Sequence, residues 1–228
     1  NIAVFSTLDR LMFRPLPYAD PGRLVQIHSF TTADVTPQAL VAATFAGRVV
    51  SESTTLSGVA YASAAQESTK IADLDPSPLR LAMVTANLLD TLGVRPVVGR
   101  GFAPDRDRAD GDAREILLDY GTWRARFGSS TAIFDRTYGR APWQYRVVGV
   151  LPEDFVLPSS LLLAKGDGIV TDTPSQITRH FGQPGWLVPS LVARLRPGAS
   201  VSQARRELEV LWQREPDSPP KAPVKPIV

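Results

Sequence analysis

The chain leaves an apolar run and approaches its first predicted strand through the stretch Phe13-Arg14-Pro15-Leu16-Pro17-Tyr18-Ala19-Asp20-Pro21-Gly22-Arg23-Leu24-Val25. The three prolines in this stretch cannot sit inside a helix, because proline lacks an N–H donor and its ring clashes with the preceding turn. The stretch therefore predicts an extended exit from an apolar element into a strand over residues 24–28. Such an exit is typical of a membrane-embedded segment that leads into a folded domain outside the membrane.

The apolar run itself, residues 2–13, is too short to cross a bilayer, which takes about 18 consecutive apolar residues. No other window of the sequence reaches that length. The run has neither a basic segment before it nor a small-residue cleavage site, so it is a poor signal peptide. From the residues alone two interpretations stay open: a buried amphipathic helix, or the end of a transmembrane helix.

The composition is that of an ordinary globular protein and excludes several function classes. The 228 residues suffice for one large or two small domains, and 43% of them are hydrophobic and 21% charged. The absence of cysteine removes disulfides, thiolate metal ligands and cysteine nucleophiles. A net charge of +2 without a clustered basic stripe argues against a nucleic-acid partner.

Short strands alternate with short helices along the chain, which predicts a mixed α/β or α+β domain. Strands are expected at residues 24–28, 56–65, 79–86, 115–119, 143–151 and 191–196, and helices at 37–50, 87–92, 120–127 and 201–211. The strand–helix passages near the two ends suggest the halves of a pseudo-symmetric layer. Two long segments remain. Residues 165–185 are predicted to form a loop, and residues 216–226 are predicted to form an extended linker because they are rich in proline.

Several helix ends are marked by the residues that flank them. Asn87 is expected to cap the helix at 87–92, and Gly93 to end it. Gly128 is expected to end the helix at 120–127. The sequence Ser200-Val201-Ser202-Gln203 predicts a capping box at the start of the last helix.

The search for a catalytic, cofactor or metal site finds no set of residues that fits one. His28 lies in a predicted strand and His180 in a predicted loop, and both are interpreted as structural. Gly99-Arg100-Gly101 is too short for a dinucleotide-binding loop and is interpreted as a tight turn. The acidic segment 105–112, with Asp105, Asp107, Asp110 and Asp112, misses the spacing of a calcium-binding loop and is interpreted as a solvated loop. We therefore predict no enzyme, no cofactor and no metal.

A series of motifs, in this order, resembles the extracytoplasmic core domain of MacB-like, FtsX-type ABC-transporter permeases, in particular the bacterial group without an ATPase domain of its own. The motifs lie at residues 1–25, 84–96, 99–102, 119–128, 145–155, 192–198 and 202–208. Each is weak alone, but their order over most of the chain is specific. Residues 160–185 match nothing in the family pattern, and the proline-rich tail differs from the strand expected before a second membrane helix.

The resemblance implies a mixed α+β fold, with a porter-like βαβ-type subdomain and an inserted smaller mixed subdomain. Residues 1–19 would be the end of the first transmembrane helix and its exit linker. Residues 20–86 plus 187–215 would form the porter-like subdomain, 87–186 the inserted subdomain, and 216–228 a proline-rich linker towards a second membrane helix.

The resemblance also implies a non-catalytic domain on the periplasmic side of the bacterial inner membrane, which relays transmembrane motion and contacts protein partners or substrate. Its partners would be the transmembrane helices of the same chain, a cytoplasmic ATPase and a periplasmic adaptor protein, with no nucleic acid. Arg14, Pro15, Leu16 and Pro17 would form the hinge, although these prolines equally serve to stop a helix. The alternative is a periplasmic sensor or small-ligand binding module on a membrane-anchored scaffold, while a hydrolase lacks a nucleophile and base.

Overall fold

The computed structural model describes residues 18–27, 40–104, 113–140, 143–158, 166–171, 187–189, 191–214 and 224–226, with side chains except at 40–42, 63–67, 187–189 and 224–226. The helices are η1 (Pro21–Arg23, a 3-10 turn), α2 (Ala43–Glu52), α3 (Leu88–Leu92), α4 (Tyr120–Phe127) and α6 (Val201–Gln213). The strands are β1 (Leu24–Ile27), β2 (Leu40–Ala42), β3 (Leu56–Thr69), β4 (Leu79–Val84), β5 (Val98–Gly99), β6 (Arg114–Leu118), β7 (Thr137–Arg140), β8 (Trp143–Val150), β9 (Gly168–Thr171), β10 (Leu187–Pro189), β11 (Leu191–Leu195) and β12 (Val224–Pro226). None of the helices within these residues is long and apolar enough to cross a membrane.

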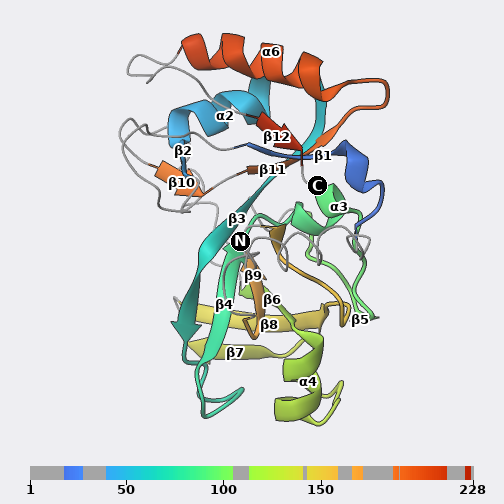
Figure 1. The fold of residues 1–228 in the computed structure, drawn as a ribbon. Helices are drawn as coiled ribbons and strands as arrows, with labels where there is room; N and C mark the ends of the chain where they lie inside the picture. The colour runs from blue at the N-terminus through green and yellow to red at the C-terminus, as the bar shows by residue number, and fades with distance from the viewer. Residues whose placement is uncertain are drawn as a thin grey trace, which may run out of the picture.

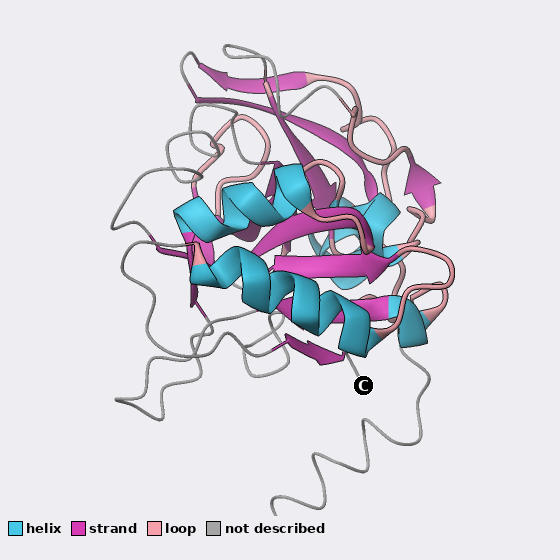
Figure 2. Ribbon diagram, turned by 90° about the horizontal axis from the view of Figure 1, so that it is seen from above, coloured by secondary structure: helices cyan, strands magenta, loops and turns pink. Residues whose placement is uncertain are grey.

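Four antiparallel strands in the order β12-β1-β11-β3 form what we call the upper lobe, together with α2 and α6 (Figure 1). The chain runs β1–α2–β3 and, much later, β11–α6–β12. Each of these units is a βαβ passage whose two strands are separated by a strand of the other unit, so the two units interlock. Both helices cover the same face of the sheet (Figure 2). This confirms the predicted α+β class with a βαβ-type part built from both ends of the segment.

The helix layer of the upper lobe is fixed by an apolar core and by one carboxylate. Phe45 of α2 meets Trp212 of α6 edge-on, with ring centroids 4.8 Å apart. Glu207 of α6 accepts hydrogen bonds from the backbone and hydroxyl groups of residues 53–55, which connect α2 to β3. Burial raises the pKa of Glu207, but the hydrogen bonds from Thr54, Thr55 and Ser53 outweigh it and lower the pKa to about 2.

The lower lobe is a mixed sheet formed by β4, β9, β6 and β8, with β5 and β7 both pairing along β8. The pairs β4–β9 and β6–β8 are parallel and the pair β9–β6 is antiparallel. Helix α4 covers one face of this sheet through Trp123, which packs with Ile116 and Leu118. The intervening residue, Leu117, points to the opposite face, because side chains alternate along a strand.

The two lobes share strand β3 and a common apolar layer around α3. The first part of β3, Leu56–Tyr61, pairs with β11, and its second part, from Ala62, pairs with β4, with a register shift between Ala62 and Gln66. Leu88 and Leu92 of α3 pack between the two sheets. They lie on the face of the upper-lobe strands opposite α2 and α6, and on the face of the lower-lobe strands opposite α4. The core is therefore continuous between the lobes, and the predicted subdomain boundaries at 86/87 and 186/187 stay predictions.

Most of the predicted elements are confirmed. The strands at 24–28, 56–65, 79–86, 115–119, 143–151 and 191–196 appear as β1, β3, β4, β6, β8 and β11, and the helix at 120–127 as α4. Gly93 and Gly128 end α3 and α4 with φ values of 67° and 58°. The predicted capping box is present at Ser200 and Gln203, and Asp119 caps α4.

Two predictions on the helices were wrong in detail. The helix expected at 37–50 begins only at Ala43, because residues 40–42 form β2 and pair with β10. Asn87 does not cap α3 with its side chain. Instead its side-chain amide donates to the carbonyl of Val59, and its side-chain oxygen accepts from the hydroxyl of Thr85.

Three segments that the sequence analysis predicted to be irregular contain strands. The expected loop 165–185 contributes β9, which lies between β4 and β6 with all four residues buried. The proline-rich tail contributes β12, which pairs with β1. Gly99 belongs to β5 rather than to a tight turn. A Cβ at this position would lie 2.3 Å from the carbonyl of Val148, so only glycine allows β5 to approach β8 so closely.

Candidate functional site

The first described residues of the chain, Tyr18–Arg23, which we call the leading segment, pack against α3 and the lower lobe. Tyr18 is 6% exposed, and its hydroxyl donates to the carbonyl of Val156 at 2.6 Å. Burial raises the pKa of this tyrosine, so its hydroxyl stays a donor. The backbone N–H of Ala19 donates to the carbonyl of Leu92 at 3.2 Å. A Cβ on Gly93 would lie only 2.5 Å from the Cβ of Ala19, which shows how closely the segments approach.

Two arginines join the leading segment to strand β11. Arg23 donates from Nε and Nη2 to the carbonyl of Leu195, at 3.1 and 2.6 Å. Arg194 of β11 donates in the opposite direction, from Nη2 to the carbonyl of Ala19 at 2.6 Å and from Nη1 to that of Asp20 at 3.4 Å. Its Nε donates to the carbonyl of Thr91 in α3 at 2.7 Å. One guanidinium thus joins β11 to two other segments of the chain, the leading segment and α3.

The direction of the Arg194 side chain follows from the strand pattern. Leu191, Ala193 and Leu195 point to the helix layer of the upper lobe, and Val192 points to α3 on the other face. Arg194 continues the Val192 face and reaches α3 at the strand end. Burial and the neighbouring Arg23 guanidinium lower the pKa of Arg194, but a guanidinium remains charged throughout the accessible pH range.

A second joint lies where β3 passes from the upper lobe to the lower lobe. The backbone N–H of Tyr61 donates to the hydroxyl oxygen of Thr85 at 3.1 Å, and the N–H of Thr85 returns to the carbonyl of Tyr61 at 3.1 Å. Asn87 extends this joint to Val59 through its side-chain amide, at 2.9 Å. The start of α3 is thereby bound to the middle of β3.

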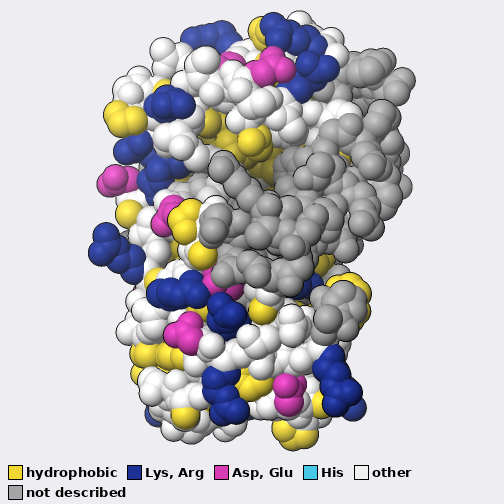
Figure 3. Space-filling model, turned by 180° about the vertical axis from the view of Figure 1, so that it is seen from behind, with side chains coloured by type: hydrophobic (Ala, Val, Ile, Leu, Met, Phe, Trp, Pro, Cys, Tyr) yellow, Lys and Arg dark blue, Asp and Glu magenta, His cyan; other side chains and the backbone are white. Residues whose placement is uncertain are grey.

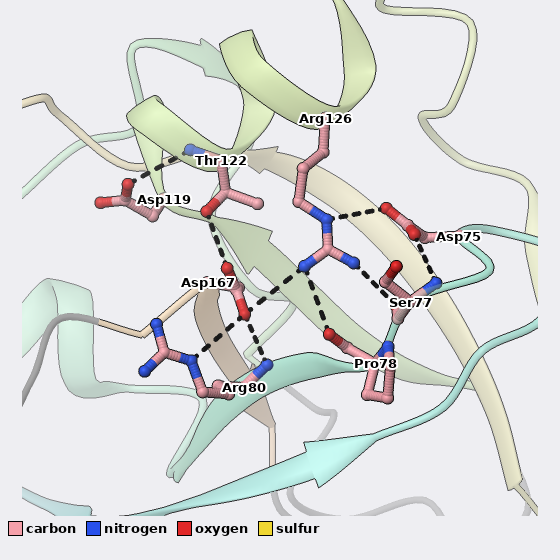
Figure 4. Close-up of polar contacts among 8 residues, drawn as sticks. All are labelled: Asp75, Ser77, Pro78, Arg80, Asp119, Thr122, Arg126 and Asp167. Carbon is pink, nitrogen blue, oxygen red and sulfur yellow. Dashed lines mark hydrogen bonds and ion pairs between the residues drawn. The ribbon is translucent and has the colours of Figure 1, made fainter.

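A third group of contacts, which we call the distal network, surrounds Arg126 of α4 (Figure 4), at the end of the lower lobe away from the upper lobe (Figure 1). Arg126 of α4 donates to the Asp75 carboxylate at 2.9 Å and to the carbonyls of Ser77 and Pro78. Asp167, directly before β9, lies 3.6 Å from Arg126 and accepts from the backbone N–H of Arg80. The network ties the β3–β4 turn, α4 and β9 together.

Within the lower lobe one carboxylate is fully buried. Glu115 of β6 is 0% exposed, accepts from Arg100 at 2.7 Å and accepts from the backbone N–H of Ala103 at 2.8 Å. The hydrogen bond to Glu115 raises the pKa of Arg100. This pair fixes the chain after β5 to the central strand, which is a structural use of both charges.

The described structure does not test the predicted site residues. The hinge residues Arg14, Pro15, Leu16 and Pro17 lie outside the described residues, as do His28, His180 and the acidic segment 105–112. Among the residues that the structure describes, no group of histidine, cysteine, aspartate or glutamate could hold a metal ion. The described arginines on one face of the molecule are spread from top to bottom with acidic side chains between them (Figure 3), as expected for solvated charges.

Sequence reasoning missed the residues that form the joints. Arg194 lies in the strand predicted over 191–196 and was given no role there, although a charged residue in the otherwise apolar Leu191-Val192-Ala193-Arg194-Leu195 is an available signal. Arg23, Arg126 and Asp167 carry no local signal, because their partners are backbone carbonyls or side chains far along the chain.

The fold is an α+β scaffold domain, defined by the two interlocked βαβ units, the shared strand β3 and the hydrogen-bonded joints. The arginine and carboxylate side chains of these joints hold segments of the chain together. The chain belongs to the family of MacB-like periplasmic core domains, whose pattern it matches over residues 1–211. It is an extracytoplasmic domain of a MacB/FtsX-like ABC transporter permease of the inner membrane. No curated protein matches the sequence.

Three solved structures share the fold at low sequence identity. The periplasmic region of MacB from Actinobacillus actinomycetemcomitans superposes with a TM-score of 0.61 at 10% identity, covering 96% of this chain and 94% of that one. A domain of a putative permease from Porphyromonas gingivalis gives 0.59 at 16% identity, with 92% of each chain covered. The extracellular domain of the noncanonic ABC-type transporter YknZ from Gram-positive bacteria gives 0.50 at 12% identity, covering 82% and 91%. These likenesses support the fold.

Proposed function

We propose that this domain is non-catalytic and relays motion of the permease's transmembrane helices to a partner protein or substrate outside the cytoplasm. The observation that carries the proposal is the pairing of β1 with β12. Val25 near the start of β1 is the register partner of Pro226 at the end of β12. The first and last strands of the described fold therefore lie side by side, and two membrane helices flanking the domain would act on this pair together.

The construction of the fold supports movement as one body. Strand β3 is continuous through both lobes, and α3 packs between their sheets. A displacement applied at the start of β1 would reach the far end of the lower lobe without an intervening flexible linker among the described residues. The predicted hinge at Arg14–Pro17 would lie between the membrane and this body, where prolines give a stiff connection.

The proposal can be tested with three spin labels. The full-length permease is first stripped of its other cysteines, then labelled and reconstituted with its ATPase. We expect nucleotide to change the distance between a spin label in a transmembrane helix and one at Ser129→Cys, an exposed residue after α4. The distance between Ser129→Cys and Gln213→Cys, one in each lobe, should stay constant. A constant membrane-to-Ser129 distance would contradict the relay, and a change between the lobes would contradict movement as one body.

A further inference from the structure

We propose that Arg194 and Arg23 form a reciprocal clasp on the leading segment, and that Arg194 is the positioning residue through which motion of the preceding chain reaches both lobes. The inference rests on the proposed relay function and names the residue that couples it. In the clasp, the leading segment's arginine binds a carbonyl of β11, and the arginine of β11 binds carbonyls of the leading segment.

The clasp contacts the chain at the point where force would first be applied. Ala19 and Asp20 precede β1, and their carbonyls accept from Arg194 before the first ladder pair of β1 with β11, Leu24 with Arg194. A pull on the leading segment therefore acts on Arg194 directly. Without the clasp, the first contact with β11 to bear the same pull would be the pairing of Leu24 with Arg194 in the β-ladder.

Arg194 is also the branch point towards the lower lobe. Its Nε donates to Thr91 of α3, and Leu92 in the same helix accepts from the backbone N–H of Ala19. Helix α3 packs on residues of both sheets, Val192 and Leu117 among them. The upper lobe receives the displacement through the backbone of β11, and the lower lobe through α3.

The chemistry of the contacts requires arginine at this position. Only a guanidinium presents several donors in a planar fork, so that three carbonyls in different directions can be bound at once. A lysine ammonium keeps the charge but not the fork. Because all acceptors of Arg194 are backbone carbonyls, its hydrogen bonds do not require particular side chains at positions 19 and 20.

The test uses the full-length permease with Arg194→Ala, Arg194→Lys and Arg23→Ala, and with Arg196→Ala as the matched control. Arg196 is exposed, carries the same charge and lies two residues further along the chain. Two quantities are measured: the nucleotide-dependent change in the membrane-to-Ser129 distance, and amide hydrogen exchange at Ala19. Basal ATP hydrolysis is followed in parallel.

We expect Arg194→Ala to accelerate exchange at Ala19 at least about tenfold, because several charge-assisted hydrogen bonds are lost, while amides of β6 keep their protection. The distance change should fall to less than about half of the wild-type change, with basal ATP hydrolysis retained. Arg194→Lys and Arg23→Ala should show intermediate losses, and Arg196→Ala none. If Arg194→Ala destabilises the whole domain, the comparison of Arg194→Lys with Arg196→Ala decides the matter.

Wild-type exchange at Ala19 together with a wild-type distance change in Arg194→Ala and Arg194→Lys would overturn the clasp while leaving the relay intact. A wild-type permease without any nucleotide-dependent change would instead refute the relay, and the coupling role of Arg194 with it. Loss of protection throughout the domain in Arg194→Lys would show that the residue serves stability alone.

Discussion

The clasp and the distal network use arginine in different ways. At the clasp, Arg194 and Arg23 donate hydrogen bonds to backbone carbonyls, and the carboxylate of the exposed Asp20 lies 3.9 Å from Arg23. At the distal network, Arg126 binds two carboxylates, those of Asp75 and Asp167, in addition to carbonyls. Both joints hold three segments of the chain, but the carboxylates differ in burial: the Asp75 and Asp167 side chains are 10% and 15% exposed, whereas that of Asp20 is 73% exposed.

This difference sets how each joint responds to mutation and to pH. When a guanidinium on neutral carbonyls is removed, hydrogen bonds are lost, and water can replace it at the carbonyls of the exposed residues Ala19 and Asp20. A guanidinium between partly buried carboxylates leaves uncompensated charges behind, which costs more. Carboxylates also titrate at mildly acidic pH, whereas carbonyls do not. The distal network should therefore be the more sensitive of the two to both kinds of change.

The largest effect is expected for Arg126→Ala. The substitution leaves the Asp75 and Asp167 side chains, which are 10% and 15% exposed, without their shared cation. We expect a loss of about 3 kcal/mol in the free energy of unfolding, measured by urea denaturation of the domain. Arg124→Ala on the same helix, which removes an exposed guanidinium 5.8 Å from the Tyr120 ring, is the control and should cost less than about 1 kcal/mol. Equal costs would mean that the carboxylates do not need Arg126.

A smaller effect is expected when the leading segment is pushed away from α3. Gly93→Ala places a side chain at a φ of 67° and a Cβ 2.5 Å from that of Ala19, so we expect a cost of about 2–3 kcal/mol. Gly128→Ala, at a φ of 58° with nothing within 4 Å, carries the backbone strain alone and should cost about 1 kcal/mol.

The matching rescue is Ala19→Gly in the Gly93→Ala background, which removes the Cβ that the new side chain meets. The double variant should recover most of the difference between Gly93→Ala and Gly128→Ala in the same denaturation experiment. Failure of this rescue would show that the leading segment does not rest on Gly93 in solution.

In both lobes the sequence predicts some elements and misses others. In the upper lobe, the pattern at Leu191–Leu195 and the Ser200–Gln203 capping box identify β11 and the start of α6, because periodicity and caps are local properties. In the lower lobe, β9 has only four residues, begins with glycine and ends with threonine. Its strand character comes from β4 and β6 on either side, and no local pattern reports that pairing.

The joints show the same limit for the candidate site. Arg194 meets carbonyls at Ala19, Asp20 and Thr91, which lie 175, 174 and 103 positions away in the chain. A backbone carbonyl looks the same at every residue, so nothing in the sequence marks it as an acceptor. The family resemblance predicted the domain and its location, whereas the contacts that distinguish its two ends required the fold.

The smallest effect, and the sharpest contrast between the joints, is expected on acidification. The hydrogen bond from Arg126 lowers the pKa of Asp75 below its ordinary value of 3.8, an effect opposed by burial and aided by the N–H of Ser77. A carboxyl with a depressed folded-state pKa stabilises the fold fully above its unfolded value, and this stabilisation is lost as pH falls through the folded value. As pH falls below about 4, the Ser77 amide should therefore lose protection against hydrogen exchange, corrected for the intrinsic rate, while the Ala19 amide keeps it.

Asp75→Asn gives the control for this pH response. The variant removes the titrating group and should lower the free energy of unfolding by about 1–2 kcal/mol at pH 7, with a shallower dependence on pH below 5. Parallel loss of protection at Ser77 and Ala19 on acidification would contradict the distinction, because it would mean that both joints open in one global step. Separate losses would show that the part of the domain next to the leading segment is held independently of the acidic groups at the far end.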